Sequence, residues 1–330
     1  MTIDRESDHG DTLGEVGELD ALKRIFPRLP WAAAELLGPG DDCAVLAAPD
    51  RRMVITTDMM IHGPDFRLAW STPYDLGWKA AATNLSDVAA MGAVPTGLVV
   101  AIAAPTDTPV GSLEAIADGL REGCEALAPG CGVIGGDLSV STVLTIVITA
   151  FGDLEGRTPV VRSGARVGDV VAVAGTLGLA AQGLRLLFDE GVVEGEPDAA
   201  AAVAVAARHP EAVAAQLRPV PPIAAGKAAS LGGATAMLDL SDGLAIDARR
   251  IATASSVALD LSSEAVGGRV QLDGGEDHSL LATFPASAAL PPAFRVIGRV
   301  VRGEGLLVDG VAYTARGGWD PYAGWDGAAG

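Results

Sequence analysis

Six short acidic motifs recur along this chain of 330 residues, and in each of them a carboxylate stands beside Gly, Ser or Thr. The motifs are Gly38-Pro-Gly-Asp-Asp42, Thr56-Thr-Asp58, Asn84-Leu-Ser-Asp87, Gly135-Gly-Asp137, Asp239-Leu-Ser-Asp-Gly243 and Gly274-Gly-Glu-Asp277. Most of them begin or end a short apolar run, where strands end and small residues let a ligand approach the backbone. Converging carboxylates repel one another unless cations lie between them, and Mg²⁺ prefers oxygen ligands and completes its shell with water and substrate phosphate. The motifs therefore predict a metal-dependent enzyme that acts on phosphates.

Length and charge narrow this prediction. Single hydrophobic cores stop growing at about 250–300 residues, so a chain of this length predicts two domains. The polar, turn-rich segment Glu155-Gly-Arg-Thr-Pro159 follows an apolar run, and we place the boundary there, giving domains 1–154 and 155–330. The net charge of −19 argues against nucleic acid or an anionic membrane surface as a partner. Because Lys and Arg form no cluster in the sequence, Mg²⁺ must supply much of the positive charge that bound phosphates need.

Cysteine spacing and the N-terminal sequence indicate the cellular compartment in which the protein is expected. Cys43, Cys124 and Cys131 form no CxxC pair, which favours free thiols over a disulfide framework or a zinc site. The acidic N-terminus lacks the cationic start of a signal peptide, and no apolar run approaches the roughly 18 residues of a membrane helix. We therefore expect a cytoplasmic protein.

Hydrophobic spacing predicts both helices and strands in each half of the chain. Helices are expected at 13–29, 73–91, 110–127, 175–190, 198–217 and 244–254. Strands are expected at 43–47, 53–57, 98–103, 143–151, 170–174, 234–240, 280–284 and 295–301, with a turn at Pro49-Asp50 between the first two. Hairpin-like connections among them favour an α+β fold over a strict alternation of strand and helix.

Each acidic motif also has an ordinary structural interpretation. An Asp in a Gly-rich turn is most often an Asx-turn residue or a helix N-cap, and this applies to Asp137 and Asp242 when each is taken alone. Asp87 differs, because it lies late in a predicted helix, where its negative charge opposes the negative C-terminal end of the helix dipole. Since Asn84 and Ser86 are its neighbours, we favour the interpretation that the Asp87 side chain faces a metal. The sequence contains no GxxxxGK[ST] and no GxGxxG after a strand, so neither a P-loop nor a dinucleotide fold is supported.

Four other residues have both a structural and a functional interpretation. Arg162, in a Gly- and Ser-rich turn, is either plain surface or a phosphate clamp. Trp319, near the C-terminus, either covers the rim of its domain or stacks on a flat ring. For His62 and His278 an exposed or structural role is favoured over metal ligation.

Seven segments of the sequence, taken in order, identify a family. They are Gly40-Asp-Asp42, Thr56-Thr-Asp58, Lys79 through Asn84-Leu-Ser-Asp-Val-Ala-Ala-Met-Gly-Ala93, Gly135-Gly-Asp137, Arg162-Ser-Gly-Ala165, Asp239-Leu-Ser-Asp-Gly-Leu244 and Gly274-Gly-Glu-Asp277. In this order and spacing they resemble the thiamine-monophosphate kinase family of the aminoimidazole-ribonucleotide-synthetase superfamily. The resemblance extends over residues 12–322.

The resemblance implies a two-domain α+β fold in which the N-terminal domains pair in a homodimer and a C-terminal α/β domain completes the ATP and substrate site. It implies Mg²⁺- and ATP-dependent phosphorylation of thiamine monophosphate to thiamine diphosphate. Transfer would be direct, because positioning and charge stabilisation suffice and the acceptor phosphate is already ionised. Several Mg²⁺ ions would be held by Asp42, Thr56, Thr57, Asp58, Asp87, Asp137, Asp239 and Asp242. ATP would contact Gly136, Asp137, Arg162 and Ser241, and the thiamine moiety would contact Glu276 and Trp319.

Three positions depart from the family pattern, all toward the thiamine end of the implied site. A substrate-contacting His of the family is Asp65 here, its His-Phe is Pro321-Tyr322, and the Tyr that follows Gly-Gly-Glu-Asp is His278. Asp65 is either a turn residue after Pro64 or a carboxylate that attracts the cationic thiazolium ring of the acceptor.

Two other functions stay open. One is another ATP-using enzyme of the superfamily that forms an amide or a selenophosphate through a phosphorylated intermediate, although the N-terminal Cys-plus-Lys segment of the latter is absent. The second is a non-catalytic nucleotide-binding relative, which loss of metal carboxylates would favour, and none is lost.

Overall fold

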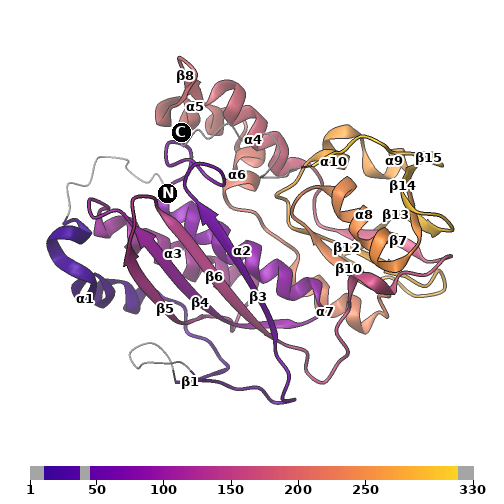
Figure 1. The fold of residues 1–330 in the computed structure, drawn as a ribbon, viewed down its shortest axis with the longest axis horizontal. Helices are drawn as coiled ribbons and strands as arrows, with labels where there is room; N and C mark the ends of the chain where they lie inside the picture. Colours follow the sequence, from indigo (N-terminus) through magenta and orange to yellow (C-terminus); the bar gives the residue numbers. More distant parts are fainter. Residues whose placement is uncertain (1–10, 38–44, 319–330) are drawn as a thin grey trace.

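The computed structural model describes residues 11–37 and 45–318, which form two main sheets with helices packed against them (Figure 1). The first sheet has the order β3-β6-β4-β5. Its strands are β3 (Val54–Ile61), β4 (Val94–Ala104), β5 (Val133–Val140) and β6 (Thr145–Asp153). The second sheet has the order β10-β12-β7-β13-β11-β14-β15. Its strands are β7 (Val170–Ala174), β10 (Ala236–Leu240), β11 (Ala258–Leu261), β12 (Ser279–Phe284), β13 (Phe294–Val301), β14 (Gly305–Val308) and β15 (Val311–Ala312). Two small pairs join β1 (Glu35–Leu37) to β2 (Val45–Leu46) and β8 (Val192–Val193) to β9 (Glu196–Pro197).

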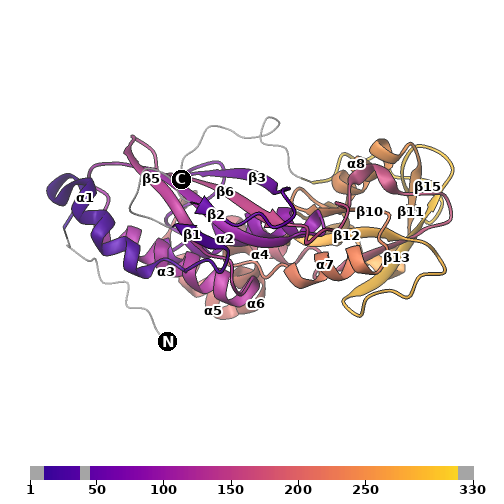
Figure 2. The same ribbon diagram turned by 90° about the horizontal axis from the view of Figure 1, so that it is seen from below.

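Helices α2 (Pro73–Ala90) and α3 (Val110–Leu127) cover one face of the four-stranded sheet (Figure 2). The start of α2 is set by a capping box, in which Thr72 accepts a hydrogen bond from the backbone of Asp75 and the Asp75 carboxylate accepts one from the backbone of Thr72. The bounds of α2 and α3 confirm the two helices predicted there.

Two glycines let α2 and α3 pack backbone against backbone. A Cβ atom at Gly77 would lie 2.0 Å from the carbonyl oxygen of Ile116, and one at Gly119 would lie 2.1 Å from that of Tyr74. Any side chain at either position would force the helices apart, so α2 is held rigidly against α3.

The opposite face of this sheet, which we call the open face, is not covered by α2 and α3. Thr56 of β3 faces α2, because its hydroxyl donates to Asp87 on that helix. Alternation along the strand then directs Ile55, Thr57 and Met59 to the open face. Ile55 and Met59 are 60% and 55% exposed, so the open face presents apolar surface in a single chain.

The second half of the chain has three helical parts. Helices α7 (Ile223–Leu231), α8 (Leu244–Ser255), α9 (Ser263–Val266) and α10 (Arg269–Asp273) pack around the seven-stranded sheet (Figure 1). A helical lobe consists of α4 (Leu179–Glu190), α5 (Ala199–Arg208) and α6 (Pro210–Leu217). The short 3₁₀ helix η2 (Arg162–Gly164) precedes β7. The two halves meet closely where α7 packs on α2, since a Cβ atom at Gly226 would lie 2.1 Å from the carbonyl oxygen of Ala89.

Strand directions correct one prediction. In the seven-stranded sheet every neighbouring pair is antiparallel except β11 and β14. Parallel strands need long crossovers, whereas these strands are mostly antiparallel neighbours, so the C-terminal half is α+β and the α/β class expected for it is wrong. The α+β class expected for the whole chain holds.

Several predicted elements have different bounds or partners. The run at 43–47 does not pair with the following strand, because β2 pairs with β1, while β3 pairs with β6 and extends to Ile61. The first helix, α1 (Leu13–Ile25), gives way to the 3₁₀ helix η1 (Phe26–Arg28), which contains Pro27. Cys124 and Cys131 are buried free thiols, and Cys43 lies outside the described residues. No helix in the described part of the chain is long and apolar enough to span a membrane.

Candidate functional site

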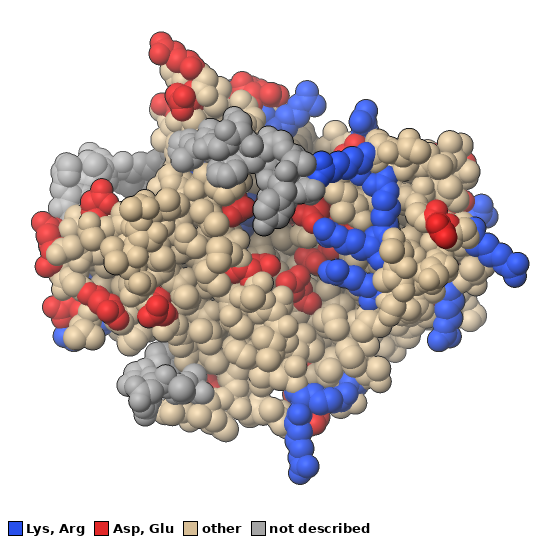
Figure 3. Space-filling view, in the orientation of Figure 1, with Lys and Arg blue, Asp and Glu red and all other residues tan. Residues whose placement is uncertain are grey.

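A cleft of about 650 Å³ lies between the two halves of the chain, alongside α2. Its lining includes Asp58, Asp65, Lys79, Thr83, Asp87, Asp239, Ser241, Asp242, Glu276 and His278. Figure 3 shows Asp and Glu side chains around the hollow at the centre of the molecule, with Lys and Arg gathered on the C-terminal side. The cleft therefore brings together acidic residues from four of the six motifs.

Helix α2 supplies one wall of the cleft. Lys79, Thr83 and Asp87 are four residues apart, so they share one face of the helix, and all three line the cleft. The facing wall is built by the second half of the chain, where β10 ends at Leu240 and the backbone turns sharply.

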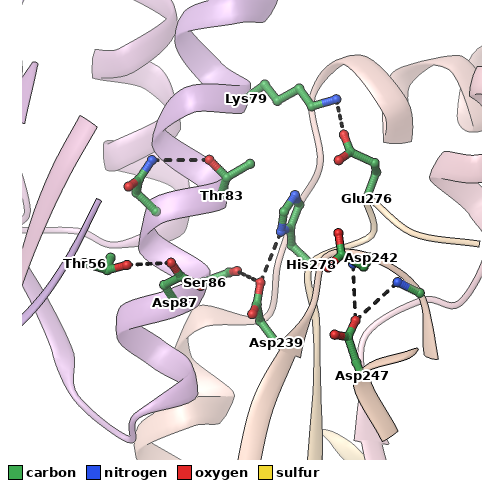
Figure 4. A network of polar contacts seen from close by, with 12 residues as sticks. Thr56, Lys79, Thr83, Ser86, Asp87, Asp239, Asp242, Asp247, Glu276 and His278 are labelled. Carbon is green, nitrogen blue, oxygen red and sulfur yellow. Dashed lines mark hydrogen bonds and ion pairs between the residues drawn. The ribbon is translucent and has the colours of Figure 1, made fainter. Parts of the chain in front are cut away.

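Hydrogen bonds connect the two walls in a network (Figure 4). Thr56 donates to the Asp87 carboxylate at 2.7 Å, and Ser86 donates to Asp239 at 2.8 Å. The Nδ1 atom of His278 lies 3.3 Å from the same carboxylate oxygen of Asp239. Since Ser86 and Asp239 are 153 residues apart, this network fixes the second half against α2.

A further ion pair, marked by a dashed line in Figure 4, crosses the cleft between Lys79 and Glu276. Glu276 and His278 both have the left-handed backbone conformation, with φ of 70° and 50°. Non-glycine residues adopt this conformation rarely and at an energetic cost, so the fold holds both side chains toward the cleft against local preference. His278 is buried and pairs with Asp239, so of the exposed and structural roles expected for it the exposed one does not hold. Its Nε2 atom has no hydrogen-bond partner among the described residues.

The acidic residues of the cleft differ in how they are neutralised. Asp239 pairs with His278, Asp242 pairs with Arg250, and Glu276 pairs with Lys79. These pairs leave Asp65, whose carboxylate accepts a hydrogen bond from the backbone of Ile61, and the two acids Asp58 and Asp87. Neither Asp58 nor Asp87 forms an ion pair with any residue that the structure describes.

The pKa values reflect this unbalanced charge. Desolvation, and then the nearby charges of Asp239 and Asp58, raise the pKa of Asp87 to about 7. Desolvation and the charge of Asp239 likewise raise the pKa of Asp58. Burial opposes ionisation of Asp239, but hydrogen bonds and the charge of His278 hold its pKa below the ordinary value. Uncompensated negative charge is therefore concentrated at Asp58 and Asp87.

Three predicted site residues of the four-stranded sheet, Thr57, Gly136 and Asp137, do not line this cleft. Across the four-stranded sheet, Asp58 pairs in register with Ile148, Ile148 with Val100, and Val100 with Gly136. Gly136 is thus three strands from Asp58, or roughly 14 Å. Asp137, next to Gly136, belongs to the adjacent row and points to the open face, as Thr57 does.

Gly136 is instead part of a second, smaller cavity of about 100 Å³ at the edge of the sheet. Apart from Glu18 and the Gly135-Gly136-Asp137 segment, its lining is apolar and comes from α1, η1, α3, β4 and β5. A Cβ atom at Gly136 would lie 2.0 Å from the carbonyl oxygen of Val100, so the strand pairing itself requires glycine there.

The remaining predicted residues take varied places. Arg162 lies exposed in η2 and does not line the cleft. The carboxylate of Asp65 accepts a hydrogen bond from the backbone of Ile61 at 2.7 Å, which gives it a turn role, and Asp65 also lines the cleft. Asp42 and Trp319 lie outside the described residues, as do Pro321 and Tyr322.

Asp277, in the motif Gly274-Gly-Glu-Asp277, has the ordinary role of a helix cap. Its carboxylate accepts hydrogen bonds from the backbone of Gly178 and Ala180 at the start of α4. It therefore caps a helix and does not join the acidic residues of the cleft.

Sequence reasoning gave no role to two of the residues that shape the acidic wall. Arg250 pairs with Asp242 and with the fully buried Asp247. Asp247 in turn accepts hydrogen bonds from the backbone of Asp242 and Gly243, which fixes the turn before α8. The sequence did offer one signal for Asp247, because an acidic residue in the first turn of a helix commonly stabilises the start of that helix.

Residues 40–154 match the family model described as AIR synthase related protein, N-terminal domain. The chain is 41% identical to the thiamine-monophosphate kinase of Mycobacterium tuberculosis, over 94% of this chain and 93% of that protein. It is 34% identical to the thiamine-monophosphate kinase of Aquifex aeolicus, over 92% of this chain and 97% of that protein.

Among solved structures, thiamine-monophosphate kinase from Stenotrophomonas maltophilia has a TM-score of 0.71 at 30% identity, covering 89% of this chain and 96% of that one. The complex described as AaThiL with AMPPCP and TMP has a TM-score of 0.71 at 32% identity, covering 92% and 96%. The chain belongs to the thiamine-monophosphate kinase family.

Proposed function

We propose that this protein transfers the γ-phosphate of ATP to thiamine monophosphate and so forms thiamine diphosphate. The observation that carries the proposal is the cleft, in which two carboxylates without a basic partner, Asp58 and Asp87, face the acidic turn of the second half. The relatives that bear the name of this activity match nearly the whole chain, and one relative is described in complex with AMPPCP and TMP.

The residues of the cleft fit Mg²⁺. Their donors are carboxylate and hydroxyl oxygens, which Mg²⁺ prefers, and the raised pKa values of Asp58 and Asp87 indicate negative charge that a cation would relieve. Among the described residues no three acidic, His or Cys side chains stand close enough to form a ready metal site, so substrate phosphates and water would complete the coordination. We assign Asp58, Asp87 and Asp239 to hold Mg²⁺, which would neutralise phosphate charge during transfer.

The chain's own residues would then orient the two phosphates. Thr56 and Ser86 fix the carboxylates of Asp87 and Asp239 by hydrogen bonds, so the acidic groups need no rearrangement when substrates bind. The acceptor phosphate is ionised at neutral pH and needs no general base. Positioning and charge stabilisation are what phosphoryl transfer chiefly requires.

We further propose that two copies of the chain pair through their open faces. The apolar surface at Ile55 and Met59 supports this, because a stable monomer rarely leaves such side chains exposed together on one sheet. In such a dimer, Asp137 and Thr57 of one chain could approach the cleft of the other, which a single chain does not allow. Gly136, Arg162 and Ser241 would contact ATP.

The assay that tests the function combines purified protein, ATP, Mg²⁺ and thiamine monophosphate, with products resolved by chromatography. We expect thiamine diphosphate, and we expect the rate to keep rising after Mg²⁺ exceeds ATP several-fold, because the acidic groups imply at least about three ions. With γ-labelled ATP and no acceptor, no label should stay on the protein. A stable phosphoenzyme would instead favour the amide-forming enzymes of the superfamily.

A separate prediction concerns Asp65. If its carboxylate attracts the thiazolium ring, Asp65→Asn should raise the KM for thiamine monophosphate several-fold while kcat and the KM for ATP stay constant. This pattern is expected when a lost interaction was equally strong in the ground state and in the transition state. The asparagine can still accept the hydrogen bond from Ile61, so the turn is kept. Steady-state kinetics decide the matter, and unchanged KM values would leave Asp65 with its turn role alone.

A further inference from the structure

The cleft has a second end that the acidic network does not use. Beyond Lys79, toward the segment before α2, the lining turns apolar and aromatic. It is made of Phe66, Arg67, Trp70, Leu184, Leu187, Phe188 and Leu217. These residues come from the loop that follows β3 and from the helical lobe.

Two aromatic rings form a fixed wall at this end. The indole of Trp70 is 4% exposed, and its Nε1 atom donates to the carbonyl oxygen of Gly191 at 2.8 Å. Its ring meets that of Phe188 edge to face, with centroids 4.9 Å apart and planes at 83°. Phe188 nevertheless stays 47% exposed, so an anchored ring offers a free surface in the cleft.

Arg67 completes this aromatic wall with a positive charge. Its guanidinium carbon lies 4.9 Å from the centroid of Trp70 and 4.7 Å from that of Phe188. Both distances lie within the range of cation–π attraction, so the rings hold the guanidinium in place. A planar ring with hydrogen-bond acceptors suits both the aromatic surface and the guanidinium.

The charges along the cleft match the parts of one substrate in order. Unpaired carboxylates at Asp58 and Asp87 suit the metal-bound phosphate. The carboxylate of Asp65, which follows β3 and lines the cleft without an ion pair to any described residue, suits a cationic ring. Trp70 precedes the first turn of α2, at the far end. A thiamine phosphate likewise carries its phosphate, a cationic thiazolium ring and a neutral aminopyrimidine ring in that sequence.

We propose that the wall formed by Arg67, Trp70 and Phe188 binds the aminopyrimidine ring of the acceptor and determines specificity for it. The inference rests on the proposed function, because it assigns part of the acceptor in the same cleft. Phe188 supplies the stacking surface, and Trp70 and Arg67 position it. The adenine ring of ATP is the competing occupant, and the experiment separates the two.

The test compares two acceptors in the wild-type protein and in Phe188→Ala. One acceptor is thiamine monophosphate, and the other is an N-methylthiazolium ethyl phosphate, which keeps the charge and the phosphate but lacks the pyrimidine. In Phe188→Ala we expect kcat/KM for thiamine monophosphate to fall about tenfold, the loss typical when a base loses an aromatic stacking partner. For the truncated acceptor kcat/KM should stay within about twofold, since no contact to it is removed.

Two further variants serve as controls. Phe188→Trp keeps an aromatic surface and should retain most of the activity with thiamine monophosphate. Val203→Ala changes an apolar side chain of the same helical lobe that is 46% exposed and does not line the cleft, so it should leave both acceptors unaffected. Thermal unfolding of each variant confirms that the lobe is folded.

Other outcomes overturn the proposal. An equal fall for both acceptors in Phe188→Ala would mean a general structural effect, and no fall would mean that the ring lies elsewhere. A raised KM for ATP with thiamine monophosphate unaffected would assign the wall to adenine. If the wild-type protein phosphorylates neither acceptor, the proposed function itself fails, and that result is seen before any variant is made.

Discussion

Replacement of Asp87 by Asn should lower turnover by several orders of magnitude while the protein becomes more resistant to unfolding. The two effects have one cause. The folded protein raises the pKa of Asp87 from the ordinary value of 3.8 to about 7, so stability falls as the pH rises from 3.8 to about 7, and the loss is complete above that pH. The neutral amide removes that cost, and the free energy of unfolding at pH 8 should rise by about 1–2 kcal/mol in the absence of Mg²⁺.

The same substitution removes a proposed Mg²⁺ ligand, so activity and metal-induced stabilisation should be lost together. Wild-type protein should gain thermal stability when Mg²⁺ is added, and Asp87→Asn should gain much less. Asp107→Asn is the matched control, because Asp107 is an exposed acid away from the cleft. Normal turnover in Asp87→Asn would contradict the metal assignment, and reduced stability would favour a purely structural role.

Two inactive variants should restore activity when they are combined in one dimer. Asp87→Asn inactivates the cleft of its own chain, whereas Asp137→Asn should inactivate the cleft of the partner, because within one chain Asp137 points to the open face. A mixed dimer of the two then contains one intact site. Purified mixed dimers should therefore have about half of wild-type activity, and an unsorted, randomly paired mixture about a quarter.

Coexpression with two affinity tags isolates the mixed dimers, and the assay is the same chromatographic one. A tandem-tagged Asp87→Asn pair is the control and should stay inactive. If the mixed dimers are also inactive, Asp137 does not act across the interface. If an active protein sediments as a monomer, the pairing of open faces is not needed for catalysis.

Local sequence rules predicted the helices of the first half closely. Pro73 after a capping Thr72, and an amphipathic run from Val110, define starts that local interactions alone specify. Strand β5 was missed because Gly135-Gly136 is also typical of a turn. The reason for glycine is instead the close approach of Val100 on the neighbouring strand, which depends on tertiary pairing.

The candidate site was predictable as a set of residues but not as an arrangement. The motifs identified Asp58, Asp87 and Asp239, and all three line one cleft. Strand alternation could already have separated Thr57 from Asp58, since neighbours on a strand point to opposite faces. The pairing of Asp242 with Arg250 and the burial of His278 depend on how α8 and the loop after α10 pack, which no local pattern encodes.

Helix α2 is fixed against α3 by two glycines, and this has a consequence for the size of the acceptor. Lys79 and Asp87 are eight residues apart, which corresponds to about 12 Å along the helix axis. A helix pinned by backbone contacts cannot stretch, so the distance between the Lys79–Glu276 pair and the acidic residues at Asp87 stays constant, and the part of an acceptor that lies between them is held to a fixed length. An acceptor that already carries a second phosphate would overrun that length, and the fold would thereby limit the enzyme to a single round of phosphorylation.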